Sequence, residues 1–177
     1  VKIENPRVVY ATFYAYGPTG PLAHFGANDL GLQAHCGLIS ITGDADRPPV
    51  RCGTAAIDLH ASLGLVSAIT MALFHRERTG FGQEVYASLL LSSAHLMNYF
   101  YTDYWATGNL HGRMGTANHL SVPNQAFPAL DGMVIIIAPN DDMWLRCVKA
   151  LDADNLRKPE FLHASDRLKL RVELVAE

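Results

Sequence analysis

Residues 58–80 read DLHASLGLVSAITMALFHRERTG, and this stretch has the pattern of one long helix. Asp58 stands where an N-cap is expected, Arg76 and Arg78 lie in the last turn, and Gly80 follows as a terminator. Apolar residues cover most of the circumference of such a helix. The pattern therefore predicts a helix that is buried in the core of a folded domain.

Shorter elements are predicted on the N-terminal side of this helix. Residues 7–14 (RVVYATFY) are rich in β-branched and aromatic residues and run into a turn-rich loop, which predicts a strand. Because this strand shows almost no polar alternation, we expect both of its faces to be covered, as in a parallel α/β sheet. Asn28 or Asp29 is expected to cap a short helix that continues through His35.

Further elements are predicted on the C-terminal side of the long helix. In chain order we expect a strand (84–88), a helix with an aromatic end (89–105), a linker (108–121), a hairpin (124–129 and 133–138), a helix capped by Asp141 and a final helix capped by Ser165. The predicted fold class is α/β, with a partial Rossmann-like layer and long helices followed by a small α+β portion. Residues 1–107 are expected to belong to the first domain and residues 121–177 to the second.

The composition excludes several classes of protein. Of the 177 residues 49% are apolar and 18% are charged, and the formal net charge is −3, so the chain is neither disordered nor basic enough to bind nucleic acid. Three widely spaced cysteines (Cys36, Cys52 and Cys147) lack the spacing of a zinc site. They are expected to be reduced thiols of a cytoplasmic protein.

Neither a leader sequence nor a membrane span is predicted. Residues 1–6 lack a basic segment that precedes an apolar one, and the patterns interrupted at both termini are those expected of a piece of a longer chain. Residues 59–74 and 85–102 carry no formal charge, but their lengths and the polar residues of the second stretch favour buried helices. The expected protein therefore has no membrane partner.

Common catalytic and cofactor motifs are absent from the sequence. Gly80-Phe81-Gly82 lacks the third glycine of a dinucleotide-binding turn and follows a helix where a strand is required. His111 and His119 are the nearby histidines of one loop, but no carboxylate or cysteine lies at ligand spacing, so no metal site is expected. Asp58 is a candidate functional residue, because unpaired amides and the helix dipole at the start of the helix favour its ionised form. Local signals alone nevertheless favour a plain helix cap.

Four segments carry a resemblance to a known family. They are ENPRVVYATFYAYGPTGPLA, NDLGLQAHCGLISITGDADRPPVRCG, DLHASLGLVSAITMALFHRERTGFGQ and VPNQAFPALDGMVIIIAPNDDMW. In this order and spacing they resemble the central part of family III CoA-transferases, a group with α-methylacyl-CoA racemases as relatives. The resemblance implies coenzyme A, bound as an acyl-CoA co-substrate, and a carboxylic acid as the second substrate. A homo-oligomer is also expected; family dimers are interlocked rings that need both ends of the family chain, so self-association here is expected through exposed sheet edges and the aromatic end of the helix over 89–105.

The same resemblance assigns roles to individual residues. It implies that Asp58 is the catalytic carboxylate, which attacks an acyl-CoA and passes through an aspartyl anhydride and an aspartyl thioester. It also implies that Tyr14, Ala15, Tyr16 and Gly17 form the loop that contacts coenzyme A, with Ala15 in place of the first glycine of the family motif. Backbone amides at the start of the long helix are expected to act as oxyanion donors.

Alternatives follow from departures from the family pattern. Asn28 occupies the position of a racemase histidine and cannot exchange a proton at neutral pH, which argues against a racemase. Residues 119–123 contain no glycine where the formyl-CoA:oxalate enzymes have a glycine-rich loop, which argues against oxalate as the acceptor. A third possibility is a truncated, catalytically incomplete chain that acts only as a structural or interaction domain.

Overall fold

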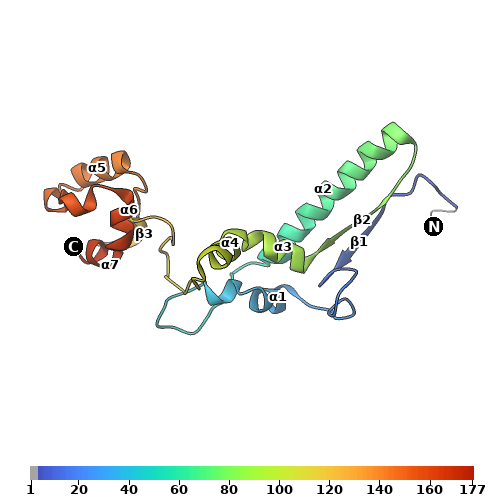
Figure 1. The fold of residues 1–177 in the computed structure, drawn as a ribbon, viewed down its shortest axis with the longest axis horizontal. Helices are drawn as coiled ribbons and strands as arrows, with labels where there is room; N and C mark the ends of the chain where they lie inside the picture. Colours follow the sequence, from blue (N-terminus) through green and yellow to red (C-terminus); the bar gives the residue numbers. More distant parts are fainter. Residues whose placement is uncertain (1–3) are drawn as a thin grey trace. The chain divides into compact units, whose positions relative to one another are not determined.

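The computed structural model describes residues 4–177, which form two compact units. Unit 1 contains the described residues up to Thr42 together with Pro48–Arg113, and unit 2 contains Gly43–Arg47 together with Met114–Glu177. Figure 1 shows helices in both units and strands that are short. The predicted α/β class is confirmed.

Most predicted elements are present, with changed boundaries. Unit 1 contains β1 (Tyr10–Tyr14), α1 (Asp29–His35), a 3-10 turn (Leu38–Ser40), α2 (Ala56–Thr79), β2 (Glu84–Ser88), α3 (Leu89–Leu96) and α4 (Asn98–Thr107). Unit 2 contains β3 (Asn124–Ala129), β4 (Gly132–Ile137), α5 (Asp141–Ala150), 3-10 turns (Asp154–Leu156 and Pro159–Phe161), α6 (Ala164–Lys169) and α7 (Arg171–Ala176). The helices predicted over 89–105 and after Ser165 are each interrupted once, at Met97 and Leu170.

Strands β1 and β2 form a parallel pair in unit 1. Tyr10 lies opposite Glu84 and Tyr14 opposite Ser88, and α2 is the crossover that runs beside both strands (Figure 1). The prediction that both faces of the first strand are covered is wrong, because the side chains of Tyr10 and Phe13 remain 51% and 45% exposed. A sheet of two strands has too little neighbouring structure to cover both faces.

The C-terminal end of α2 follows its predicted signals. Gly80 has a φ of +81°, and its amide donates to the carbonyl oxygen of Arg76 at 2.8 Å. This left-handed conformation favours glycine, so the residue ends the helix as predicted. Two residues later the chain again requires glycine, since a Cβ atom at Gly82 would lie 1.9 Å from the carbonyl oxygen of Val8.

The predicted burial of α2 is wrong. Ile57, Ala61 and Ala72 are buried, whereas Leu63 and Met71 are 69% and 70% exposed. Within unit 1, one stripe of the helix contacts β1, β2, α1 and α3, and much of the remaining surface of the helix is exposed. By length and composition, α2 is the one helix of residues 4–177 that could cross a membrane. This is weak evidence for a membrane span, because core helices of soluble proteins pass the same test.

Each unit has its own hydrophobic core. The core of unit 1 consists of side chains from α1, α2, α3 and α4: Leu32, Cys36, Ile57, Ala61, Leu89, Met97 and Phe100. The core of unit 2 lies among the helices and the chain that flanks the hairpin: Val122, Ala138, Trp144, Val148, Phe161 and Leu174. Burial of the larger aliphatic and phenylalanine side chains among them contributes on the order of 1.5–3 kcal/mol each, so each unit has its own source of stability.

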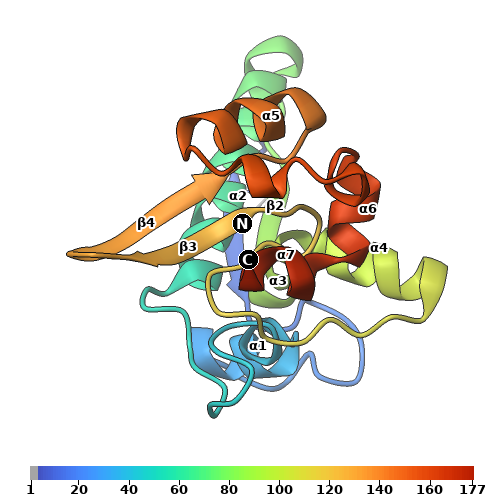
Figure 2. The same cartoon turned by 90° about the vertical axis from the view of Figure 1, so that its left-hand side faces the viewer.

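The predicted hairpin forms in unit 2. Strands β3 and β4 pair antiparallel from Asn124 opposite Ile137 to Ala129 opposite Gly132, and Figure 2 shows the two strands joined by their turn. Leu130 and Asp131 form the tight turn between them. The turn therefore lies one residue earlier than the Asp131-Gly132 pair of the sequence pattern.

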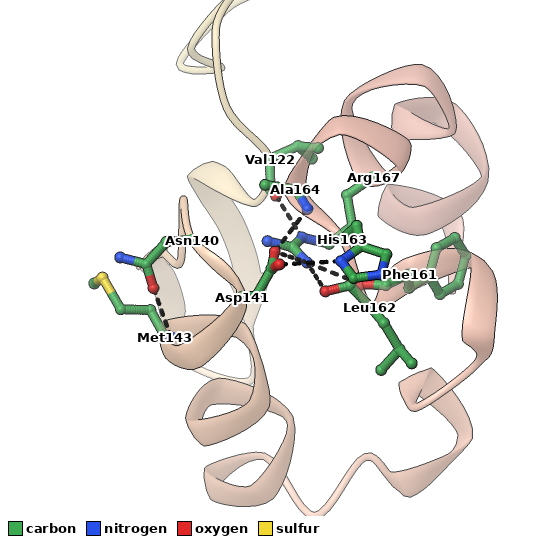
Figure 3. A network of polar contacts seen from close by, with 9 residues as sticks. All are labelled: Val122, Asn140, Asp141, Met143, Phe161, Leu162, His163, Ala164 and Arg167. Carbon is green, nitrogen blue, oxygen red and sulfur yellow. Dashed lines mark hydrogen bonds and ion pairs between the residues drawn. The ribbon is translucent and has the colours of Figure 1, made fainter.

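A buried arginine joins the segments of unit 2. Arg167 is fully buried, and its guanidinium donates to the carbonyl oxygens of Phe161 and Leu162 at 2.9 Å and of Val122 at 3.3 Å (Figure 3). Its Nη1 also lies 3.3 Å from a carboxylate oxygen of Asp141. One side chain thus satisfies backbone acceptors from two separate parts of the chain.

Asp141 belongs to the same cluster and is not the cap predicted for its helix. Asn140 is the N-cap of α5 and accepts from the amide of Met143 at 2.9 Å, whereas Asp141 accepts from the amide of Ala164 at 2.7 Å. A hydrogen bond from His163, the Ala164 amide and the charge of Arg167 together lower the pKa of Asp141. This carboxylate therefore links α5 to the start of α6 (Figure 3).

The predicted cap of the final helix is also wrong. Ser165 is the second residue of α6, and His163 precedes the helix without a capping hydrogen bond from its side chain. The acceptor for the amide of Ala164 comes from Asp141 in α5, 23 residues earlier in the sequence.

Candidate active site

Asp58 is the third residue of α2, two positions inside the helix that it was predicted to cap. Ala55 is the N-cap, without a capping side chain. Asp58 is a partly buried residue, and within residues 4–177 its carboxylate has no hydrogen-bond donor and no cationic partner. A carboxylate without partners keeps its lone pairs available for reaction.

The cap of α2 is supplied by another helix. Asp29, the first residue of α1, accepts hydrogen bonds through its Oδ2 from the amides of Ile57 at 2.9 Å and of Asp58 at 3.3 Å. Asp29 is only 5% exposed. The N-terminus of α2 therefore receives a negative charge, as its dipole favours, but from 29 residues earlier in the sequence.

The two carboxylates affect each other electrostatically. Desolvation raises the pKa of Asp58 above its ordinary value of 3.8, and the negative charge of Asp29 raises it further. The start of the helix was predicted to favour the ionised form of Asp58, whereas burial and the charge of Asp29 move its pKa in the opposite direction.

This raised pKa predicts a pH-dependent difference in stability between wild type and Asp58→Asn. A group whose pKa is raised by folding stabilises the fold below its unfolded pKa, and this contribution is lost as the pH rises through the folded pKa. Asp58→Asn should therefore gain stability relative to wild type between pH 3.5 and pH 7, measured by urea unfolding at both values. A difference that stays constant between the two pH values would contradict the predicted shift.

The first amides of α2 are already occupied. The amides of Ile57 and Asp58 donate to Asp29, the amide of Ala56 donates to Thr54, and the amide of Leu59 donates to Ala55. Since each amide has one hydrogen to donate, the prediction that these groups act as oxyanion donors is wrong for this conformation.

The four residues of the predicted coenzyme A loop lie at the end of β1. Tyr14 packs edge-on against Tyr86, and the carbonyl oxygen of Ala15 accepts from the amide of Leu90 at 2.9 Å. Tyr16 packs edge-on against His35 of α1 and contacts the unit 1 core, which contains Ile57. Gly17 has a φ of +108°, a conformation that favours glycine.

A cavity of about 390 Å³ lies beside this loop. We call it the strand-end cavity; it is lined by Tyr16, Gly17, Pro18, Thr19, Tyr86, Ser88, Leu90, Leu91 and Ala94. The cavity is located at the carboxyl ends of β1 and β2, where open α/β sheets commonly bind ligands. Tyr16 and Gly17 line it, Tyr14 and Ala15 do not, and neither does Asp58.

Other candidate residues have structural partners. Asn28 is the N-cap of α1 and accepts from the amide of Gly31 at 2.9 Å. His111 lies 2.7 Å from a carboxylate oxygen of Asp103, and the residues that the structure describes contain no group of three side chains that could hold a metal ion. The three cysteines are not in disulfides.

The sequence patterns missed Asp29 and Gln33. Asp29 was predicted only as a possible cap of its own helix, and Gln33 was not singled out, yet the two side chains are hydrogen bonded and both are buried. The available signal was a pair of polar residues four positions apart, the spacing of neighbours on one helix face, on the same short helix as the buried Leu32.

Unit 1 thus carries an unpartnered carboxylate near a helix start and, separately, a cavity at its strand ends. Comparison with known proteins identifies the family. The sequence matches CoA-transferase family III over residues 1–177, and the chain belongs to this family.

Several relatives are similar over most of the chain. It is 33% identical over 166 residues to the acetyl-CoA:oxalate CoA-transferase of Acetobacter aceti, covering 93% of this chain and 43% of the relative. It is 34% identical over 152 residues to the succinate–glutarate CoA-transferase of Agrobacterium fabrum, covering 85% of this chain and 38% of the relative. The chain thus spans less than half the length of these relatives.

Solved structures show the same fold. A CAIB/BAIF family protein from Brucella suis is 31% identical, with a TM-score of 0.79 over 99% of this chain and 47% of that one. A hypothetical protein from Mycobacterium tuberculosis has a TM-score of 0.84 at 23% identity, again over 99% of this chain and 46% of the other, and supports the fold alone.

Proposed function

We propose that the protein transfers coenzyme A between carboxylic acids and that Asp58 is its nucleophile. The observation that carries this proposal is the partner-free carboxylate of Asp58 in a chain that belongs to CoA-transferase family III. The relatives named above are CoA-transferases for different acids, so the class of reaction is better supported than any particular donor or acceptor.

The proposed reaction begins with covalent catalysis. A carboxylate oxygen of Asp58 attacks the thioester carbonyl carbon of an acyl-CoA, the C–S bond breaks, and coenzyme A leaves as a thiolate. The thiolate then attacks the aspartyl carbonyl of the mixed anhydride, which releases the first acid as a carboxylate and forms an aspartyl thioester. A second carboxylate reverses these steps and leaves with coenzyme A. Division of one exchange into several displacements lowers each barrier.

The strand-end cavity is the proposed contact site for coenzyme A. Tyr16 offers an aromatic face, and the positive φ of Gly17 turns the loop beside it. The remaining loop residues, Tyr14 and Ala15, would act indirectly, since Tyr14 packs on Tyr86 and Ala15 fixes the start of α3. Coenzyme A is a co-substrate here and is consumed and regenerated within one cycle.

The position of Asn28 favours a transferase over a racemase. Its side-chain oxygen caps α1, and a neutral amide does not exchange protons at physiological pH. The proposed reaction needs no acid–base group at this position. That oxalate is not the acceptor stays a prediction, as do a homo-oligomeric state and a cytoplasmic location.

An acyl-enzyme adduct tests the proposed function. We expect incubation of the intact protein with a panel of acyl-CoAs to give an acyl or coenzyme A adduct on Asp58, which hydroxylamine removes because anhydrides and thioesters react with it. Intact-mass spectrometry and peptide mapping measure this. Glu84→Gln, which changes an exposed carboxylate on β2, is the matched control and should form the adduct normally. A folded wild-type protein that forms no adduct with any acyl-CoA supports a purely structural or interaction role.

A further inference from the structure

Asp29 is a buried carboxylate without a cationic partner in the described part of the chain. It is 5% exposed, and its neighbours in hydrogen-bond distance are all neutral donors. Burial of an unpaired charge is costly unless several donors and a favourable dipole compensate it. Retention of such a charge at the start of α2 suggests a role that a neutral cap would not fill.

The orientation of this carboxylate is fixed from both sides. Its Oδ2 accepts from the amides of Ile57 and Asp58, while its Oδ1 accepts from the side-chain amide of Gln33. Gln33 is fully buried, and its Oε1 accepts from the amide of Cys52 at 2.9 Å. The chain of hydrogen bonds therefore connects the loop before α2, helix α1 and the first turn of α2.

We propose that Asp29 is a positioning residue for the nucleophile, holding the backbone at Asp58 and placing a negative charge beside its carboxylate. This inference rests on the proposed function of Asp58. The hydrogen bonds from Ile57 and Asp58 fix the peptide from which the Asp58 side chain projects, so they limit the directions in which its carboxylate can point.

The neighbouring charge also favours reaction. Repulsion from Asp29 contributes to the raised pKa of Asp58, and a more basic carboxylate is a stronger nucleophile. When Asp58 attacks the thioester, its charge passes to the departing thiolate and the covalent intermediate at Asp58 is neutral. The repulsion between the two carboxylates is thereby relieved as the anhydride forms.

Two variants separate the effect of the Asp29 charge from the effect of the hydrogen bonds that hold Asp29 in place. Asp29→Asn retains one oxygen acceptor but removes the charge, while Gln33→Ala removes the Gln33 hydrogen bonds and leaves the charge in place. For Asp29→Asn we expect kcat to fall by about 10–100-fold with a nearly unchanged KM for acyl-CoA. We also expect the acidic limb of its pH–rate profile, where Asp58 ionises, to move to lower pH. Gln33→Ala should lose stability and leave this limb in place.

The outcomes distinguish the two proposals. If wild type forms the Asp58 adduct but Asp29→Asn has wild-type kcat or an unmoved acidic limb, Asp29 has no positioning role and the proposed function stands. If wild type forms no adduct, both proposals fail. If Asp29→Asn does not fold, Asp29→Glu provides the test, because it keeps the negative charge on a longer side chain. We expect the acidic limb of its pH–rate profile to stay in place and its kcat to fall at least about tenfold. Wild-type kcat in Asp29→Glu would overturn the positioning role.

Discussion

Asp58→Asn is expected to reduce the exchange of coenzyme A between carboxylic acids by at least about a thousandfold. An amide of nearly the same size cannot form the aspartyl anhydride, so the covalent route is lost. The fold should remain intact, because the Asp58 side chain makes no hydrogen bond or ion pair within residues 4–177. Transfer of a labelled carboxylic acid into acyl-CoA measures the rate, and urea unfolding verifies the fold.

Glu84→Gln is the control for this loss of activity. Glu84 lies at the amino end of β2, whereas the strand-end cavity is at the opposite end of the strand, and its side chain is exposed. Its rate should remain within about twofold of wild type, as is usual for an exposed residue outside the site. Wild-type exchange by Asp58→Asn would remove Asp58 as the nucleophile.

Arg167→Ala is expected to lower the free energy of unfolding of unit 2 by about 3 kcal/mol or more. The substitution leaves the carbonyl oxygens of Val122, Phe161 and Leu162 without their donor and removes the guanidinium that stacks 5.3 Å from the ring of Trp144. Unfolding in urea, followed by Trp144 fluorescence in a Trp105→Phe background, reports on unit 2 because Trp105 belongs to unit 1.

A surface arginine provides the matched control for Arg167. Arg146 pairs with Asp142 at 2.8 Å on α5, and both side chains are at least 70% exposed. Arg146→Ala should therefore cost no more than about 0.5 kcal/mol. Equal losses in the two variants would show that the buried hydrogen bonds of Arg167 do not stabilise unit 2.

Local signals predicted most helices and strands of this chain, but not the tertiary contacts that set where they begin or are interrupted. Gly80 ends α2 as predicted, because a left-handed glycine is a property of a few neighbouring residues. The start of α2 was misplaced, since its capping acceptor, Asp29, lies 28 residues before Ile57 and becomes a neighbour only in the folded chain. The interruptions at Met97 and Leu170 contain neither glycine nor proline, so no local signal marked them.

Burial and electrostatics were harder to predict than secondary structure. The apolar composition of α2 predicted a core helix, but burial depends on how many neighbouring elements cover a face, and here they cover one stripe. The candidate role of Asp58 came from a family resemblance and not from its local pattern. Its partial burial and its proximity to Asp29, which together raise its pKa, arise from tertiary contacts that no sequence spacing encodes.

The assignment of Gly43–Arg47 to unit 2 has a consequence for how the units can be separated. These five residues lie between two stretches of unit 1, and the carbonyl oxygen of Gly43 accepts from the amide of Gly115 at 2.9 Å. The polypeptide therefore passes from one unit to the other three times, and a single proteolytic cut after Arg113 leaves a piece of unit 2 attached to unit 1. During synthesis these five residues leave the ribosome long before Met114–Glu177, so unit 2 can be completed only after all of unit 1 has been made.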